Sequence, residues 1–351
     1  MILLLGVLLI ACNDDDKPAV DPVVQVLVES LANELTPLPV DPLQWTDEQL
    51  QFLDEVSDQD IVGLGEATHG TSEFFRAKHR ILRYLAEKHG FKIFAIEADF
   101  GESLFLNEAV LKSDKGEIEN LMKNKMHFWT WKTTEVRDML YWMCDYNNGK
   151  SNAEKIQYWG IDCQFNTFHP DMVLSQLSTA NIPFIAFAQD VLTEAKTAAA
   201  NRFGSYSQSS FDAYLRRVDA LTDSIDKYEE VITAKSSKRQ YELTLRLTLV
   251  TRQTAEVMYY GQKQNVAINY RDKYMADNAA WLLHYSPGQK IALWAHNYHV
   301  SAIYQSMGQN LKTLIPGKYT TIGFLFSAGQ FTASNPKGRP ISGHKHSDAG
   351  R

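Results

Sequence analysis

The sequence predicts an α/β protein in which a mostly parallel β-sheet is flanked by helices and carries a large helical insertion. Short apolar runs alternate with segments of helical periodicity, as expected for buried parallel strands joined by crossover helices. From about residue 170 to 286 the pattern is almost entirely helical, which indicates an insertion or cap packed over the sheet. The apolar runs are Asp60–Gly65, Lys92–Ile96, Ile156–Ile161, Ile291–Ala295 and Tyr319–Phe326.

The composition is that of a globular protein and argues against nucleic-acid binding. The chain has 351 residues, of which 44% are hydrophobic and 22% charged, which is sufficient for a large core. Its formal net charge of -7 disfavours binding to phosphates through a basic face, and no nucleic-acid-binding motif is present. We expect no nucleic-acid partner, and the sequence sets no expectation for the oligomeric state.

The N-terminal residues are typical of an export signal. Residues 1–12 form an apolar run too short to span a bilayer, and their end, Leu9-Ile10-Ala11-Cys12, is similar to a bacterial lipobox. We therefore expect a signal peptide and lipidation of Cys12. The lipid alone would then anchor the protein to the bacterial cell envelope, at the outer membrane or the periplasmic face. A buried N-terminal strand is the alternative interpretation.

The remaining chain is expected to form one domain between a linker and a tail. Residues 13–25 are acidic and contain proline, as in a linker, and residues 26–335 follow as the single domain. Residues 336–351 are basic and rich in Gly and Pro, which predicts a disordered tail. Cys144 and Cys163 lack metal-ligand spacing and are interpreted as isolated core residues.

Ionisable residues stand at the ends of the predicted strands. Glu66, Glu97, Asp162 and His296 each end or directly follow an apolar run. In open α/β sheets, ligands bind in the crevice outside the carboxyl ends of the strands. We therefore expect these side chains to converge on one site.

The segment Thr71–Lys88 predicts an amphipathic helix with a lysine on its apolar face. Lys78 lies in the middle of the apolar stripe, where an ammonium group without a partner is costly or loses its proton. We expect Lys78 to reach Glu66 or Glu97, with extension along the helix to solvent as the alternative. The stripe comprises Phe74, Phe75, Ile81, Leu82 and Leu85, and the residues expected on the solvated face are Arg76, Arg80, Arg83 and Glu87.

His69 is the candidate general base. It follows Glu66 by three residues in a glycine-containing loop, and a neighbouring carboxylate orients a histidine ring and stabilises its imidazolium. His296 and His299 come to another strand end, where either could transfer a proton or donate to a developing oxyanion. The sequence has no G-x-S-x-G elbow and no cysteine in a nucleophile context, which favours water as the nucleophile.

The same residue types can also ligate a metal. The H-E-x-x-H motif is missing and the spacings match no metal motif, so we expect no cofactor and no metal site. A bound divalent cation stays open as an alternative. The corresponding second hypothesis is a metal- or haem-binding lipoprotein, or a metal-dependent hydrolase of a related superfamily.

Taken together, the motifs resemble the erythromycin esterase family over roughly residues 55–330. The resemblance implies an α/β hydrolase that opens an ester or macrocyclic lactone, such as a macrolide, an activity compatible with antibiotic resistance. Members of the family extend further at the C-terminus, so the chain is expected to end before the usual family fold does. The matching segments are Leu64–Thr71, Glu73–Phe75, His79–Leu85, Phe94–Ala98, Trp129–Trp131, Val136–Asn147, Tyr158–Asp162, Arg271–Asn278 and Ala295–His299.

The resemblance also implies roles for individual residues. His69 would activate water with support from Glu66, and Glu97 would be the second essential carboxylate. Lys78 stands where some members carry a catalytic-site arginine, and lysine offers a point charge instead of a bidentate fork. The histidine pair implied at the C-terminal end is His296 with His299. The candidate substrate contacts are Asp162, Trp129, Trp131 and Arg271, and a place in the core is the alternative interpretation for the two tryptophans.

Overall fold

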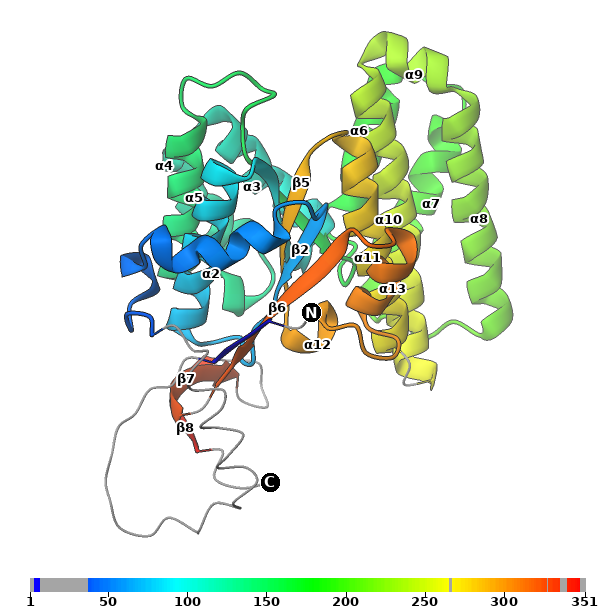
Figure 1. Cartoon of the computed structure of the whole chain (residues 1–351). Helices are drawn as coiled ribbons and strands as arrows, with labels where there is room; N and C mark the ends of the chain where they lie inside the picture. The colour runs from blue at the N-terminus through cyan, green and yellow to red at the C-terminus, as the bar shows by residue number, and fades with distance from the viewer. Residues whose placement is uncertain (1–2, 7–36, 265–266, 327, 335–339, 348–351) are drawn as a thin grey trace.

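A computed structural model describes residues 3–6, 37–264, 267–326, 328–334 and 340–347. Helices cover both faces of a central sheet (Figure 1). The sheet has six strands in the order β1-β6-β2-β5-β3-β4, and each neighbouring pair is parallel. The predicted α/β fold class is confirmed. The strands are β1 (Leu3–Gly6), β2 (Ile61–Leu64), β3 (Phe91–Asp99), β4 (Gln157–Asp162), β5 (Lys290–Trp294) and β6 (Tyr319–Leu325).

Two cores lie on opposite faces of the sheet because successive strand residues point in opposite directions. In β3, Ile93 and Ala95 join one core, whereas Phe94 and Ile96 join the other. The second core packs against α2 (Ser72–Lys88), α3 (Phe100–Lys112), α4 (Lys115–Lys125), α5 (Thr134–Asn147) and the 3-10 helices η1 (Pro42–Gln44), η2 (Glu48–Val56) and η3 (Trp129–Trp131).

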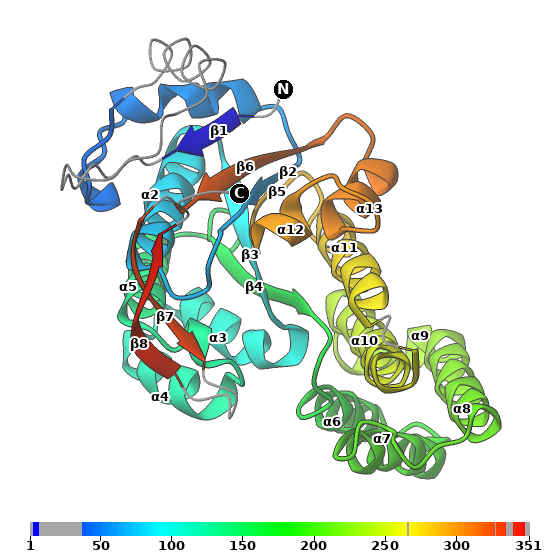
Figure 2. The same cartoon turned by 90° about the horizontal axis from the view of Figure 1, so that it is seen from below.

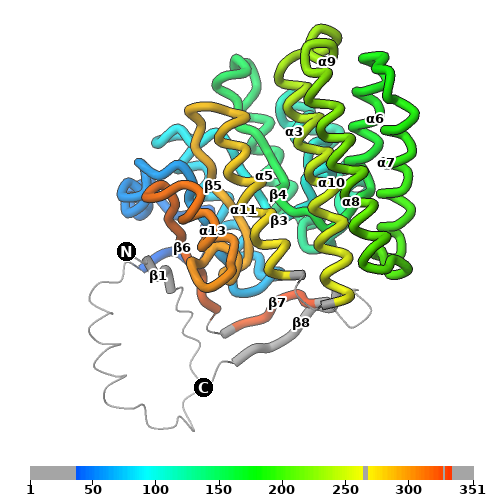
Figure 3. The backbone as a smooth tube through the Cα atoms, turned by 90° about the vertical axis from the view of Figure 1, so that its right-hand side faces the viewer, coloured from blue at the N-terminus to red at the C-terminus, as the bar shows by residue number. Residues whose placement is uncertain are grey.

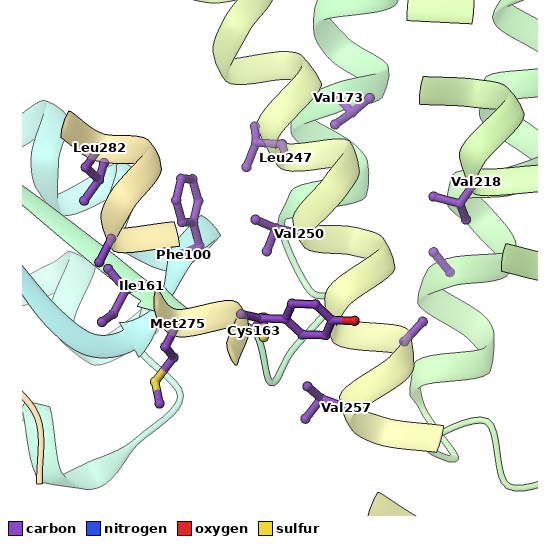
Figure 4. Packing of buried hydrophobic residues seen from close by; sticks show 14 of the residues in the cluster. Phe100, Ile161, Cys163, Val173, Val218, Leu247, Val250, Val257, Met275 and Leu282 are labelled. Carbon is purple, nitrogen blue, oxygen red and sulfur yellow. The ribbon is translucent and has the colours of Figure 1, made fainter. Parts of the chain in front are cut away.

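The first core extends from the sheet into the helical cap. Figure 3 shows the long cap helices side by side, and Figure 4 shows Leu247 and Val250 of α10 between Val173 of α6 and the sheet-side residues Phe100 and Ile161. Cap and sheet therefore share one apolar core. Helices on this side are α6 (His169–Ala180), α7 (Ile185–Ala199), α8 (Gln208–Lys227), α9 (Glu229–Lys235), α10 (Lys238–Gln264), α11 (Ala267–Tyr285), α12 (Asn297–Val300) and α13 (Met307–Leu314).

The C-terminal segment corrects one expectation. Residues 340–347, predicted to belong to a disordered tail, form β8 (Pro340–Ser347), which pairs antiparallel with β7 (Ala328–Ser334). The backbone ladder orders a segment whose polar composition gave no strand signal. The hairpin lies at the lower end of the sheet in Figure 1 and on the side of α2 to α5 in Figure 2.

The N-terminal run also contains a strand. Leu3–Gly6 pairs in parallel with β6 at the sheet edge, which is the alternative considered for this run. Cys12 and the linker 13–25 lie outside the described residues, so the signal peptide and the lipid anchor stay predictions. Among the described residues, no helix is long and apolar enough to span a membrane.

Arg80 was expected on the solvated face of α2 but is buried, with 8% of its surface exposed. The segment before β2 covers it, because the Arg80 Nε donates to the Trp45 carbonyl at 2.7 Å and a terminal nitrogen donates to Asp47 at 2.6 Å. The helical wheel could not reveal this, since the covering residues come from another part of the chain.

The β7–β8 hairpin contacts the loop that carries His69, and a substitution at Gly70 tests this contact. The Thr332 amide donates to the Gly70 carbonyl at 3.0 Å, and a Cβ at position 70 would lie 1.8 Å from the Thr332 oxygen. We expect Gly70→Ala to displace β7, which hydrogen exchange would detect as lost protection of the Thr332 amide. Gly116→Ala is the matched control, because its Cβ would have its nearest neighbour at 3.4 Å. Unchanged protection in Gly70→Ala would contradict the contact.

Candidate active site

Glu66 lies in the loop that follows β2, and its carboxylate is fully buried. One oxygen, Oε1, lies 2.8 Å from Nδ1 of His69. The other, Oε2, accepts the indole N–H of Trp294 at 2.7 Å and lies 3.4 Å from Nζ of Lys78. Each oxygen thus has a defined partner, so the buried negative charge is compensated.

Lys78 forms the ion pair that its place on the apolar stripe predicted. Its side chain is fully buried, and Nζ lies 5.5, 5.1 and 4.4 Å from the ring centroids of Phe74, Trp294 and Phe324. Burial lowers the pKa of Lys78 to about 8, and Glu66 opposes this decrease. The expected pairing with Glu66 is confirmed. Because the ammonium group is fully buried, any part that it plays in the reaction acts through Glu66, and its catalytic role stays a prediction.

His69 presents one ring nitrogen to the surroundings. Because Nδ1 is bound to the Glu66 carboxylate, the proton of the neutral ring lies on Nδ1 and leaves Nε2 as the basic atom. The side chain is 42% exposed. Burial lowers the pKa of His69, but the Glu66 hydrogen bond and the charge of Glu97 raise it by more, so the pKa ends above 6.5. This is the geometry of a general base open to substrate or water.

His296 is held as a neutral ring beside His69, with 5.3 Å between the ring centroids. Its Nδ1 accepts the Tyr298 amide at 3.2 Å, so the proton lies on Nε2, which donates to the Ala67 carbonyl at 3.2 Å. Burial and the neighbouring His69 lower the pKa of His296. Both ring nitrogens are bound to backbone groups in this structure, and the proton transfer or oxyanion contact expected of His296 stays a prediction.

Arg271 of α11 joins two of the predicted strand-end carboxylates. It donates to both oxygens of Asp162, at 3.0 and 2.8 Å, and to Oε1 of Glu97 at 2.6 Å. Burial raises the pKa of Glu97, but the charges of Arg271 and His299 lower it well below 4.5. The site therefore contains an ionised carboxylate and a guanidinium group in fixed positions.

His299 lies next to this pair and is bound on both sides by carboxylates. Its Nδ1 is 2.9 Å from Asp272, and its Nε2 is 3.4 Å from Glu97. Burial lowers the pKa of His299, but Glu97 and the Asp272 hydrogen bond raise it to about 9. A terminal nitrogen of Arg271 also lies 3.2 Å from Nε2 of His299, so both side chains meet beside the Glu97 carboxylate.

Two of the predicted substrate contacts are buried. Asp162 is fully buried and bound to Arg271, and Trp131 is 1% exposed with its indole N–H on the Glu97 carbonyl at 3.0 Å. Both expectations are corrected, because neither side chain reaches the surface. Trp129 is half-buried and lines a pocket of about 430 Å³ beside the His69 loop. The other lining residues are Gly70, Thr71, Ser72, Phe75, Lys132, Thr133, Glu135 and Thr332.

Two residues of the site were not predicted. Asp272 fixes His299 and also accepts the Met307 amide at 2.7 Å, and Trp294 fixes Glu66. A buried indole N–H usually finds an acceptor, and Trp294 stands at a strand end. The sequence therefore contained a signal for the contact between Trp294 and Glu66. Asp272 had none, because its partners come from α12 and α13. Among the described residues, no group of three or more His, Cys, Asp or Glu could hold a metal ion.

The buried ion pair predicts a stability difference between two lysines of α2. We expect Lys78→Met to lower the free energy of unfolding by about 3–5 kcal/mol, because it leaves the Glu66 charge without its cation. Lys88→Met is the control, since its pair with Asp47 at 3.1 Å is about half exposed and should contribute less than about 1 kcal/mol. Urea unfolding measures both, and equal effects would contradict the buried pair.

Comparison with known proteins gives the family. A profile of the erythromycin esterase family matches residues 86–350, which begin after the His69 loop. In sequence, the chain is 26% identical to erythromycin esterase type II of Escherichia coli, over 80% of this chain and 72% of that protein. It is 24% identical to the putative hydrolase YbfO of Bacillus subtilis, over 75% of this chain and 61% of that protein.

Solved structures share the fold. A Bacillus cereus protein superposes with a TM-score of 0.81 at 22% identity, covering 93% of this chain and 80% of that chain. A mutant of erythromycin esterase EreC, in its open conformation, superposes with a TM-score of 0.69 at 19% identity, covering 86% of this chain and 81% of that chain. Because the family profile matches more than half of the sequence, this chain belongs to the erythromycin esterase family.

Proposed function

We propose that this protein hydrolyses a bulky carboxylic ester or macrocyclic lactone with water activated by His69. The observation that supports the proposal best is the Glu66–His69 pair, which has a buried carboxylate on Nδ1 and leaves Nε2 open. Membership of a hydrolase family and the identity to erythromycin esterase type II support the same reaction class.

In the proposed reaction, Nε2 of His69 accepts a proton from water as the water oxygen attacks the ester carbonyl. Glu66 stabilises the imidazolium that forms, because its charge is only 2.8 Å from Nδ1. The imidazolium then returns the proton to the leaving alkoxide. Since the nucleophile is water and the base is a side chain, the proposed reaction uses no cofactor.

Arg271 is the proposed donor to the developing oxyanion. Its guanidinium is fixed by Asp162 and Glu97, so little reorganisation is needed when negative charge develops. The charge of Arg271 also lowers the pKa of the His69 ring. His299, itself held by Asp272, positions Glu97 beside Arg271.

The pocket beside Gly70 is the proposed site for an apolar part of the substrate. Its volume of about 430 Å³ falls within the range of small-molecule sites, and it combines aromatic and polar lining residues. Gly70 and Thr71 line this pocket and directly follow His69 in the chain. In this proposal Trp129 contacts the substrate in the pocket beside the loop that carries His69.

The role of His69 predicts a large and selective loss of activity. We expect His69→Ala to lower kcat/KM by about 10²–10⁴-fold, because proton transfer by a positioned base contributes on that order. Purified protein would be assayed with erythromycin and with a bulky aryl ester, which separates macrolide from other ester substrates. His284→Ala, which changes an exposed histidine, is the matched control. Full activity in His69→Ala would contradict the proposal.

The same role predicts the direction of the pH dependence. Only neutral His69 can accept a proton, and its pKa is raised above 6.5, so kcat/KM should rise with pH and reach half its maximum above 6.5. Glu66→Gln removes the charge that supports the imidazolium and should move this midpoint to lower pH. A pH–rate profile, with folding checked by circular dichroism, measures the shift. An unchanged midpoint would rule out Glu66 as the partner of the catalytic base.

A further inference from the structure

Another carboxylate–histidine pair, Glu102 with His127, lies outside the residues used above. Glu102 is in the first turn of α3, and its side chain is fully buried. His127 precedes η3 and is 26% exposed, with Nδ1 2.7 Å from Oε2 of Glu102. The relation of the two side chains is the same as in the Glu66–His69 pair.

The hydrogen bonds define the tautomer of His127. The backbone N–H of His127 donates to Oε2 of Glu102 at 2.8 Å, so this oxygen is an acceptor. Nδ1 contacts the same oxygen and must therefore carry the proton of the neutral ring. Nε2 is then the basic atom, and the hydroxyl of Thr167, 2.9 Å away, donates its proton to it.

We propose that Thr167, His127 and Glu102 form a second catalytic site, in which the Thr167 hydroxyl is the nucleophile for acyl transfer from esters. A hydroxyl bound to a histidine that is itself oriented by a third group is the diagnostic arrangement of an activated nucleophile. Thr167 is exposed, so a substrate can reach its oxygen. This site is independent of the reaction proposed for His69.

The loop that carries Thr167 is fixed at several points. Phe165 donates its amide to Asp99 at 3.2 Å and stacks on His127 with 4.0 Å between centroids and 7° between planes. Asn166 donates to the Thr251 carbonyl at 3.4 Å. Beyond Thr167 the chain enters α6, and the N-terminal end of a helix favours a developing negative charge. The hydroxyl and its base are therefore held in position before substrate arrives.

The surroundings favour an ester with an aromatic or aliphatic acyl group. Phe165 and Phe168 are half-buried, and the Phe168 ring lies 5.9 Å from that of His127. Phe105 and Phe128 extend this apolar surface through edge contacts at 5.2 Å each. Lys125 lies over the Phe105 ring at 4.5 Å, so the surface ends in a positive charge.

The proposed reaction balances without a further reactant. The Thr167 oxygen attacks the ester carbonyl carbon while its proton moves to Nε2 of His127. The bond between carbonyl carbon and alcohol oxygen breaks, and the alcohol leaves with that proton. Water then attacks the acyl-threonine, gives its proton to His127, and releases the acid as the Thr167 hydroxyl is restored.

Covalent labelling tests the proposal on the full chain. An aryl fluorophosphonate should form an adduct on Thr167, identified by mass spectrometry of the digested protein. The buffer is kept above the pKa of about 7 to which burial, together with the charge of Asp99, raises Glu102 against the opposing effect of His127. We expect Thr167→Ser to label, Thr167→Val to lose the adduct, and His127→Gln to label at least about 100-fold more slowly.

The control variants separate labelling at this site from labelling by non-specific reaction or by the His69 site. Thr179→Val, at an exposed position on α6, should label like the unchanged protein. His69→Ala should also retain the Thr167 adduct, so loss of the first activity leaves the second measurable. Thr167→Val alters only an exposed side chain, and its fold can be verified by thermal unfolding. Absence of an adduct on Thr167, or equal labelling in His127→Gln, would overturn the proposal.

Discussion

The buried carboxylate of Glu66 is the constraint on which the structure of the candidate active site depends. An isolated charge at this position would be strongly destabilising, so its partners must be supplied by the fold. Lys78 comes from α2, Trp294 from β5 and His69 from the loop after β2. Leu64 and Trp294 are register partners in the β2–β5 ladder, so strand pairing itself brings the indole to Glu66. Sheet register and helix packing thereby determine the position of His69, the proposed general base.

A second charged group attaches the cap to the sheet. Arg271 reaches from α11 to Glu97 of β3 and Asp162 of β4, and Asn278 of the same helix donates to the Ile161 carbonyl at 2.8 Å. The cap therefore contributes a cation, Arg271, to the carboxylates at the strand ends. The cap is thus part of the candidate active site. The apolar core shared by cap and sheet keeps this cation in place.

The fold class, the strands that carry the site and the Glu66–Lys78 pair could be predicted because each leaves a local pattern. A lysine on an apolar stripe requires a counter-charge, and strand-end carboxylates supply one. Asp272 and the Thr167–His127 contact were not predictable, because they depend on which distant segments meet in space. Trp131 lies in the core, which was the alternative interpretation for the tryptophans, because its neighbours bury it.

Lysine at position 78 suits this particular carboxylate. The Trp294 indole N–H donates a hydrogen bond to Oε2 at 2.7 Å. The Lys78 ammonium lies 3.4 Å from the same oxygen and compensates its charge without a bidentate contact. A guanidinium group presents several donors in a rigid plane and would compete with Trp294 for Oε2 or with His69 for Oε1. The rings of Phe74 and Phe324 also enclose Nζ closely. A point charge behind Glu66 thus leaves Oε1 to His69, the proposed general base.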